Sequence, residues 1–176
     1  TLFMKKVSIF MLMILSTYQI FAQQKNIESK GYARFAKEGK FQPYNFHRRA
    51  VGDDEVLIDI LYSGICHTDI HTVKEDWGPI EYPLVPGHEI VGKISKVGKN
   101  VKKFKVGDYA GVGCFVYSCG ECEYCKKGLE QYCLKGGIAT YNAHDHYHDN
   151  EKTQGGYSNN IVLSEKFATK VPKNAE

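Results

Sequence analysis

Short apolar runs, broken by Gly and Pro, recur along most of the chain. Residues 55–61 and 89–97 combine β-branched residues with partial alternation of apolar and polar positions, which predicts a strand in each. Two further strands are predicted at 160–163 and 167–171, and residues 27–49 indicate another strand with loops. Short strands separated by turns are typical of a mainly β, barrel-like domain.

Two segments depart from this strand pattern. Residues 70–75 predict a short helix, with Thr68 or Asp69 near its N-cap. Residues 142–154 are polar and predict an exposed loop. The alternating histidines of this loop offer a metal site as one interpretation and an ordinary solvated loop as the more frequent one: His144, His146 and His148.

The N-terminus has the layout of a secretory signal peptide. Met4, Lys5 and Lys6 precede an uncharged apolar run over 7–15, and Ala22 offers a cleavage site. The run is shorter than the roughly 20 residues that cross a bilayer, so a removed signal is favoured over a membrane anchor. We therefore predict a signal peptide at 1–22, a linker at 23–30 and one domain at 31–176, exported if the signal is real and cytoplasmic otherwise.

Composition and charge narrow the class of protein. The 176 residues are 43% hydrophobic and 24% charged, as expected of one globular domain, and the net charge is only +3. Basic residues are dispersed among acids rather than gathered in a stripe, which argues against a nucleic-acid partner.

The cysteines carry the strongest chemical signal in the sequence. A C-x2-C-x2-C run and a cysteine seven residues after it bring four thiolates together: Cys119, Cys122, Cys125 and Cys133. Such a set suits a closed, structural zinc site. Two disulfides or free thiols are the alternatives, although five cysteines between 114 and 133 do not suit complete pairing.

A second group of possible metal ligands lies at the ends of two predicted strands. Cys66 and His71 follow the first strand, and His88 and Glu89 lie at the start of the second. A thiolate and an imidazole are good zinc ligands. On spacing alone, unrelated core residues are the more frequent interpretation of such a pair.

A dinucleotide-binding fingerprint is missing from these residues. Gly111 and Gly113 come nearest, but Val116 stands where the third glycine belongs. A nicotinamide-binding domain is therefore expected outside this sequence.

Taken in order, these motifs resemble those of the zinc-dependent medium-chain alcohol dehydrogenases, most closely the cinnamyl-alcohol-dehydrogenase-like branch. The motifs are residues 64–71, 86–92, 107–108, 112–114, the cysteine lobe with 128–133, and 155–157. The resemblance runs from about Gly31 to the C-terminus. It implies a chaperonin-10-like (GroES-like) β-barrel with a zinc-binding lobe, the N-terminal catalytic domain alone, with the Rossmann domain absent.

The resemblance also implies a role for each candidate residue. Cys66 and His88 would hold a catalytic zinc, with Glu89 beside it or entering its coordination sphere. Thr68 would take the alcohol proton and pass it through the cofactor ribose to His71. His67 would lie near the cofactor phosphate, and Trp77 would line the substrate pocket. The four lobe cysteines would bind the structural zinc.

The implied activity is interconversion of primary alcohols and aldehydes with NAD(P), with NADP favoured by the branch. The family's catalytic zinc has a second cysteine ligand, and no cysteine follows Cys133. We therefore expect a fragment or truncated product that is inactive alone, with a homodimer only for a full-length form. The alternatives are a non-catalytic zinc-stabilised β-barrel that binds or supports a partner, and a secreted disulfide domain without metal.

Overall fold

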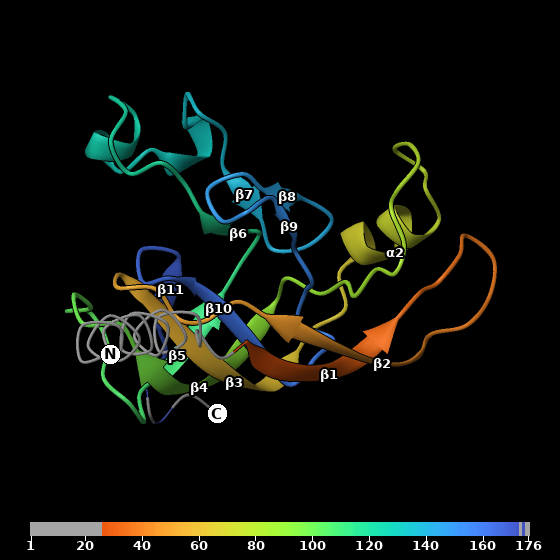
Figure 1. Ribbon diagram of the computed structural model, residues 1–176, viewed down its shortest axis with the longest axis horizontal. Helices are drawn as coiled ribbons and strands as arrows, with labels where there is room; N and C mark the ends of the chain where they lie inside the picture. The colour runs from red at the N-terminus through yellow and green to blue at the C-terminus, as the bar shows by residue number, and fades with distance from the viewer. Residues whose placement is uncertain (1–25, 173, 175–176) are drawn as a thin grey trace, which may run out of the picture.

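The computed structural model describes residues 26–172 and residue 174 (Figure 1). The predicted signal peptide at 1–22 lies outside the described residues. The structure has a curled antiparallel sheet, a long hairpin against it and a small lobe above it.

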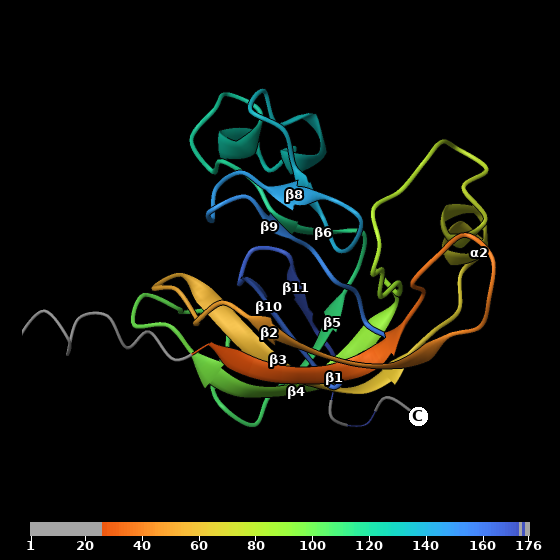
Figure 2. The ribbon, with the colours of Figure 1, turned by 45° about the vertical axis from the view of Figure 1, so that its right-hand side comes forward.

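The central sheet contains the strands that the apolar pattern predicted. Its strand order is β10-β3-β4-β5-β11, and every pairing is antiparallel. The strands are β3 (Glu55–Ser63), β4 (Ile90–Val97), β5 (Tyr109–Val112), β10 (Asn160–Ser164) and β11 (Ala168–Lys170). Two irregularities in the β3–β4 register accompany the curl seen in Figure 2. The prediction of a mainly β domain is confirmed.

The concave side of this sheet encloses the main core. Ile58, Ile94 and Leu163 are almost fully buried and belong to one apolar cluster with residues of β5 and β11. Buried residues alternate with less buried ones along β4, whereas all five residues of β10 are buried. Both patterns give short apolar runs that predict strands from the sequence.

A second pair of strands forms the long hairpin that lies against the sheet (Figure 2). β1 (Ile27–Ala33) pairs with β2 (Gln42–Arg48), and Ile27 lies opposite Arg48. Residues 27–30 lie in this strand, whereas the sequence predicts a linker at 23–30. The buried hydroxyl of Ser29 donates to Asn160 Oδ1 at 2.6 Å, which ties the start of the strand to β10.

The lobe leaves the sheet between β5 and β10. β6 (Phe115–Tyr117) pairs with β7 (Ile138–Ala139), and the short helical turns η1 (Cys125–Lys127) and η2 (Glu130–Tyr132) lie between them. β8 (His144–Asp145) and β9 (Glu151–Lys152) form a small hairpin after the lobe. The prediction of an exposed loop at 142–154 is wrong in part, because Asp145 is buried against His148 and Arg49.

The helix α2 (His67–Val73) follows β3 and begins earlier than predicted. Its N-cap is Cys66, and the Asp69 carboxylate accepts the Cys66 backbone N–H at 3.0 Å. Asp69 therefore occupies the third helical position, as in a capping box, rather than the cap itself.

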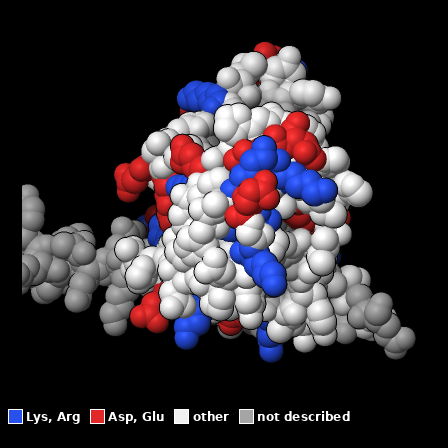
Figure 3. Space-filling model, turned by 90° about the vertical axis from the view of Figure 1, so that its right-hand side faces the viewer, with Lys and Arg blue, Asp and Glu red and all other residues white. Residues whose placement is uncertain are grey.

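Within residues 26–172, no helix is long and apolar enough to cross a membrane. The face shown in Figure 3 carries acidic and basic side chains interspersed with one another.

Candidate functional site

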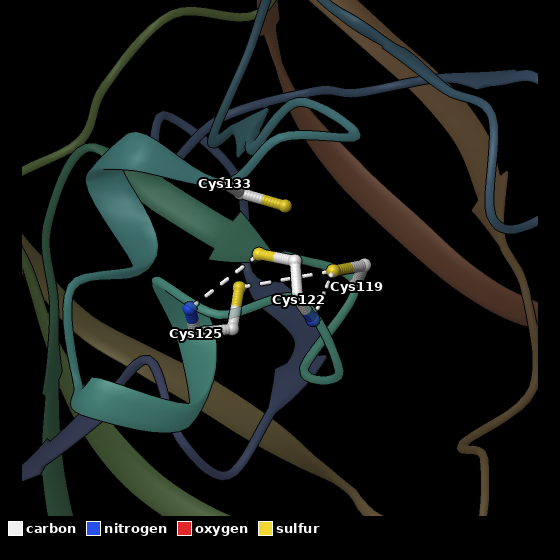
Figure 4. Close-up of side chains that lie close together, drawn as sticks. All are labelled: Cys119, Cys122, Cys125 and Cys133. Atoms are coloured by element: carbon white, nitrogen blue, oxygen red, sulfur yellow. Dashed lines mark hydrogen bonds between the residues drawn. The ribbon is translucent and has the colours of Figure 1, made fainter.

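The four lobe cysteines point into one small space (Figure 4). Their sulfur atoms all lie within 4.8 Å of one another, and the Sγ atoms of Cys119 and Cys125 are 3.8 Å apart. Zinc–sulfur bonds of about 2.3 Å in a tetrahedron place two sulfurs roughly 3.8 Å apart, whereas a disulfide needs about 2.05 Å. The lobe therefore fits a four-thiolate zinc site, and the cysteines are free of disulfides.

The backbone of the lobe prepares the cysteines for this role. The N–H of Cys122 lies 3.4 Å from Cys119 Sγ, and the N–H of Cys125 lies 3.5 Å from Cys122 Sγ. Hydrogen bonds from Cys125 and Leu134 N–H lower the pKa of Cys122 to about 6. Burial raises the pKa of Cys125 to about 11, and a cation bound beside it would favour its thiolate form.

The second group of ligands also comes together, at one edge of the sheet. Ser63 at the end of β3 pairs with Ile90 at the start of β4. The residues just after β3 and just before β4 therefore meet, and Gly64 N–H donates to Glu89 O at 2.8 Å. This pairing brings ligand atoms of Cys66, His88 and Glu89 within 4.8 Å of one another.

These three side chains fit a zinc ion that keeps an open position. Bonds of about 2.0–2.3 Å hold two ligands of one zinc no more than about 4.6 Å apart, so ligand atoms that all lie within 4.8 Å of one another can reach a single ion with little movement. Sulfur, nitrogen and oxygen donors from three residues leave room for water or substrate. Cys114 does not belong to this ligand group.

Asp69 connects the two loops that carry the ligands, a role that sequence reasoning missed. Its Oδ2 accepts the N–H of Cys66 at 3.0 Å and the hydroxyl of Tyr157 at 2.9 Å. Its Oδ1 accepts the N–H of Gly87 at 3.0 Å and lies 3.4 Å from His88 Nδ1. With Nδ1 beside a carboxylate, Nε2 is the nitrogen of His88 left for a metal.

A cleft opens beside this group of ligands. Thr68, His88, Cys114 and Tyr141 contribute to its lining. The Thr68 hydroxyl lies 3.5 Å from Cys66 Sγ, so a hydroxyl stands next to the ligands on the cleft side. Tyr141 is a second residue that sequence reasoning missed, because its separation from His88 along the chain hides their contact.

The remaining candidates form an aromatic group along helix α2. His67 and His71 are one helical turn apart, with ring centroids separated by 5.0 Å, and the Trp77 ring lies 5.1 Å from His71. Nδ1 of His71 lies 2.7 Å from Asp76 Oδ2. Trp77 is 68% exposed and stands beside His71 rather than among the residues that line the cleft.

Comparison with known proteins identifies the fold and the family. Residues 52–173 match the family model described as the alcohol dehydrogenase GroES-like domain. The chain belongs to this family. The prediction of a GroES-like barrel with a zinc lobe is thereby confirmed in its fold.

Individual relatives of the GroES-like domain support the branch as well. The chain is 46% identical to cinnamyl alcohol dehydrogenase 7 of Oryza sativa subsp. japonica, over 86% of this chain and 40% of the relative. It is 56% identical to NADP-dependent alcohol dehydrogenase C 1 of Mycolicibacterium smegmatis, over 71% of this chain and 36% of the relative.

A solved structure agrees with these relatives. The crystal structure of CAD from Helicobacter pylori complexed with NADP(H) matches with a TM-score of 0.82 and 54% identity, covering 86% of this chain and 43% of that one. The predicted resemblance to the cinnamyl-alcohol-dehydrogenase-like branch is confirmed. This GroES-like chain spans about two fifths of the length of the curated relatives that it matches.

Proposed function

We propose that this chain is the zinc-binding catalytic domain of an NADP-dependent alcohol dehydrogenase or aldehyde reductase. Its substrates would be primary alcohols and aldehydes, converted by hydride transfer. The observation that carries the proposal is the convergence of Cys66, His88 and Glu89 at a cleft beside the Thr68 hydroxyl.

The names of the relatives support the substrate and cofactor classes. Cinnamyl alcohol is a primary alcohol, and NADP appears in the names of the mycobacterial relative and of the Helicobacter structure. Because the chain spans about two fifths of its relatives, the activity of the whole protein is part of the proposal rather than a finding.

In the proposed chemistry, the hydride and the proton leave the alcohol by separate routes. Bound zinc would act as a Lewis acid on the substrate oxygen. Thr68 Oγ1 would accept the hydroxyl proton of the alcohol, and the proton would pass by way of the cofactor ribose to His71. Asp76, 2.7 Å from His71 Nδ1, leaves Nε2 of that ring to take up the proton. His67 would face the cofactor phosphate, and Trp77, which lies against His71 rather than in the lining of the cleft, would contact substrate from outside it.

The second candidate is a non-catalytic barrel stabilised by zinc. The number of thiolates favours this candidate. The lobe provides four thiolates, a complete set for a structural zinc, whereas the cleft group provides one. The two candidates differ in how many metal ions bind and in whether the cleft metal responds to substrate.

Cobalt substitution distinguishes the two candidates. The purified chain would be dialysed against a weak chelator and titrated with Co²⁺, whose absorption reports thiolate ligation and coordination geometry. We expect one metal retained in the lobe and one exchangeable metal that Cys66→Ser removes. Cinnamyl alcohol or cinnamaldehyde should change the spectrum of the exchangeable cobalt. A chain that holds only the lobe metal, or a cleft cobalt indifferent to both compounds, would favour the non-catalytic candidate.

The chain on its own should not turn over NADP. Its 176 residues contain no dinucleotide fingerprint, so the cofactor would lack most of its binding site. We expect negligible alcohol-dependent formation of NADPH by the purified chain, followed at 340 nm. Sustained NADPH formation that Cys66→Ser abolishes would contradict this expectation.

We further propose that residues 1–22 are a signal peptide that directs export. Its support is the arrangement of Lys5, Lys6, an apolar run and Ala22. N-terminal sequencing of the protein from its native cells should find the chain beginning at Gln23. An intact segment upstream of Ala22 would contradict the proposal.

A further inference from the structure

We propose that Tyr141 is a positioning residue that holds the His88 imidazole ready for the cleft metal. The inference rests on the metal site of the proposed function. The two rings are stacked, with centroids 5.8 Å apart and planes inclined by 21°. They come from segments that are distant in sequence, since Tyr141 follows the lobe and His88 precedes β4.

Tyr141 is held firmly enough to act as a fixed surface for the imidazole. The residue is 7% exposed and belongs to an apolar cluster with Val73 of helix α2 and Leu84. Its hydroxyl lies 3.4 Å from Thr72 Oγ1, which donates to the Thr68 carbonyl at 2.8 Å. The tyrosine ring is therefore anchored on the same helix that carries Thr68.

The two neighbours of His88 restrict different motions of its ring. Asp69 lies against the Nδ1 edge at 3.4 Å and fixes which nitrogen is turned away. Tyr141 lies against the face and opposes tilting of the ring plane. Together they keep Nε2 directed toward Cys66 and Glu89 before a metal arrives. An imidazole without this face contact would lose more side-chain entropy on binding metal, so affinity should fall.

The Tyr141 ring also contributes to the lining of the cleft. One side chain therefore sets both the orientation of a metal ligand and part of the wall that a substrate would meet. Loss of the Tyr141 ring should therefore weaken metal binding most and substrate binding less.

Three variants separate the stacking contact from general packing. Tyr141→Leu removes the aromatic face, Tyr141→Phe keeps the face and removes the hydroxyl, and Val73→Ala loosens the same apolar cluster without the stacked ring. Each variant would be checked for folding by thermal melting and then titrated with Co²⁺ at the cleft site, with Cys66→Ser as the blank.

We expect Tyr141→Leu to weaken cobalt binding about tenfold. Replacing a residue that supports a metal ligand typically lowers metal affinity by about 10–100-fold, and this contact belongs at the lower end of that range. Tyr141→Phe and Val73→Ala should bind cobalt nearly as the parent chain does. A folded Tyr141→Leu variant with unchanged affinity would overturn the inference, as would a Tyr141→Phe variant that is equally weak. If Tyr141→Leu does not fold, Tyr141→Met would be used in its place, because methionine fills the space without a flat aromatic face.

The same titrations separate this inference from the proposed function. If cobalt binds the cleft of the parent chain but ignores alcohols and aldehydes, the proposed function fails while the Tyr141 comparison still decides the inference. If the parent chain binds no cobalt at Cys66, His88 and Glu89, both are overturned.

Discussion

At the scale of single residues, the cleft depends on a carboxylate that contacts no substrate in the proposed chemistry. Asp69 is 3% exposed and accepts three hydrogen bonds, from Cys66, Gly87 and Tyr157. These donors offset the cost of removing a carboxylate from water. The same bonds draw the start of helix α2 and the loop before β4 together, which places both ligand loops.

Replacing Asp69 by Asn tests this dependence. The amide nitrogen would face groups that are themselves donors, so at least one buried N–H or O–H loses its acceptor. We expect a loss of about 1–3 kcal/mol in unfolding free energy and a fall of about 10–100-fold in cobalt affinity at the cleft. Chemical denaturation and cobalt titration measure the two effects.

Asp59→Asn is the matched control for Asp69→Asn. Asp59 is an exposed carboxylate on β3 that accepts a bond from Ser95 Oγ at 2.9 Å. Its replacement should leave stability and cobalt binding almost unchanged. Equal effects of the two substitutions would show that Asp69 has no special role.

At the scale of elements, the lobe owes its shape to tight turns around the cysteines. Gly120 and Gly128 adopt φ values of 68° and 73°, a left-handed conformation that favours glycine. The lobe's two paired strands, β6 and β7, are only three and two residues long. Since the strand pairing is so short and the other backbone bonds of the lobe are local turns, metal ligation should supply much of its stability.

Cys122→Ser tests the contribution of the metal to the lobe. Loss of one thiolate should remove one zinc per chain and lower the melting temperature, because ligand binding to the folded state is part of the folding free energy. Elemental analysis and thermal melting measure both. Cys114→Ser is the control, since Cys114 is exposed and outside both ligand groups. Unchanged zinc content in Cys122→Ser would exclude the lobe as a zinc site.

At the scale of the whole molecule, hydrogen bonds from Arg48 connect the hairpin of β1 and β2 to the barrel. It is buried at the end of β2 and donates to the carbonyls of Gln154 and Gly155 and to side chains of Ser158 and Asn160. Burial lowers the pKa of Arg48 to about 10, which still leaves it charged at neutral pH. One side chain thus satisfies acceptors on the segment that leads into β10.

Arg48→Met should therefore destabilise the entire domain. The substitution keeps much of the apolar stem but leaves buried acceptors without a donor, at about 1–3 kcal/mol for each group left unpaired. We expect a loss of about 3 kcal/mol in chemical denaturation. Lys99→Met, which removes an exposed ion pair with Asp53, should change stability little. A loss with Arg48→Met no larger than with Lys99→Met would contradict this account.

Local patterns in the sequence were sufficient for much of the fold. The strands β3, β4, β10 and β11 were predictable because each is a short run of β-branched or other apolar residues between turns. Burial alternates along β4 and is continuous along β10. The sequence predicts helix α2 about one turn late, because Cys66 is an unusual N-cap whereas Thr68 and Asp69 are residue types that favour a cap. The hairpin of β8 and β9 has no apolar pattern that would predict it, because its strand residues are polar and Asp145 alone among them is buried.

The sequence by itself predicted the four cysteines of the lobe, because their short-range spacing and residue type suffice for that. Cys66, His88 and Glu89 were predicted from the order of several motifs along the chain rather than from their spacing. Only the tertiary structure decided which side chains stand around those ligands. Asp69 reaches Tyr157 across the domain, and Tyr141 reaches His88, through contacts that exist only once β3, β4 and the lobe connection have assembled. A contact between distant segments leaves no local pattern, since it depends on packing that the whole chain must form first.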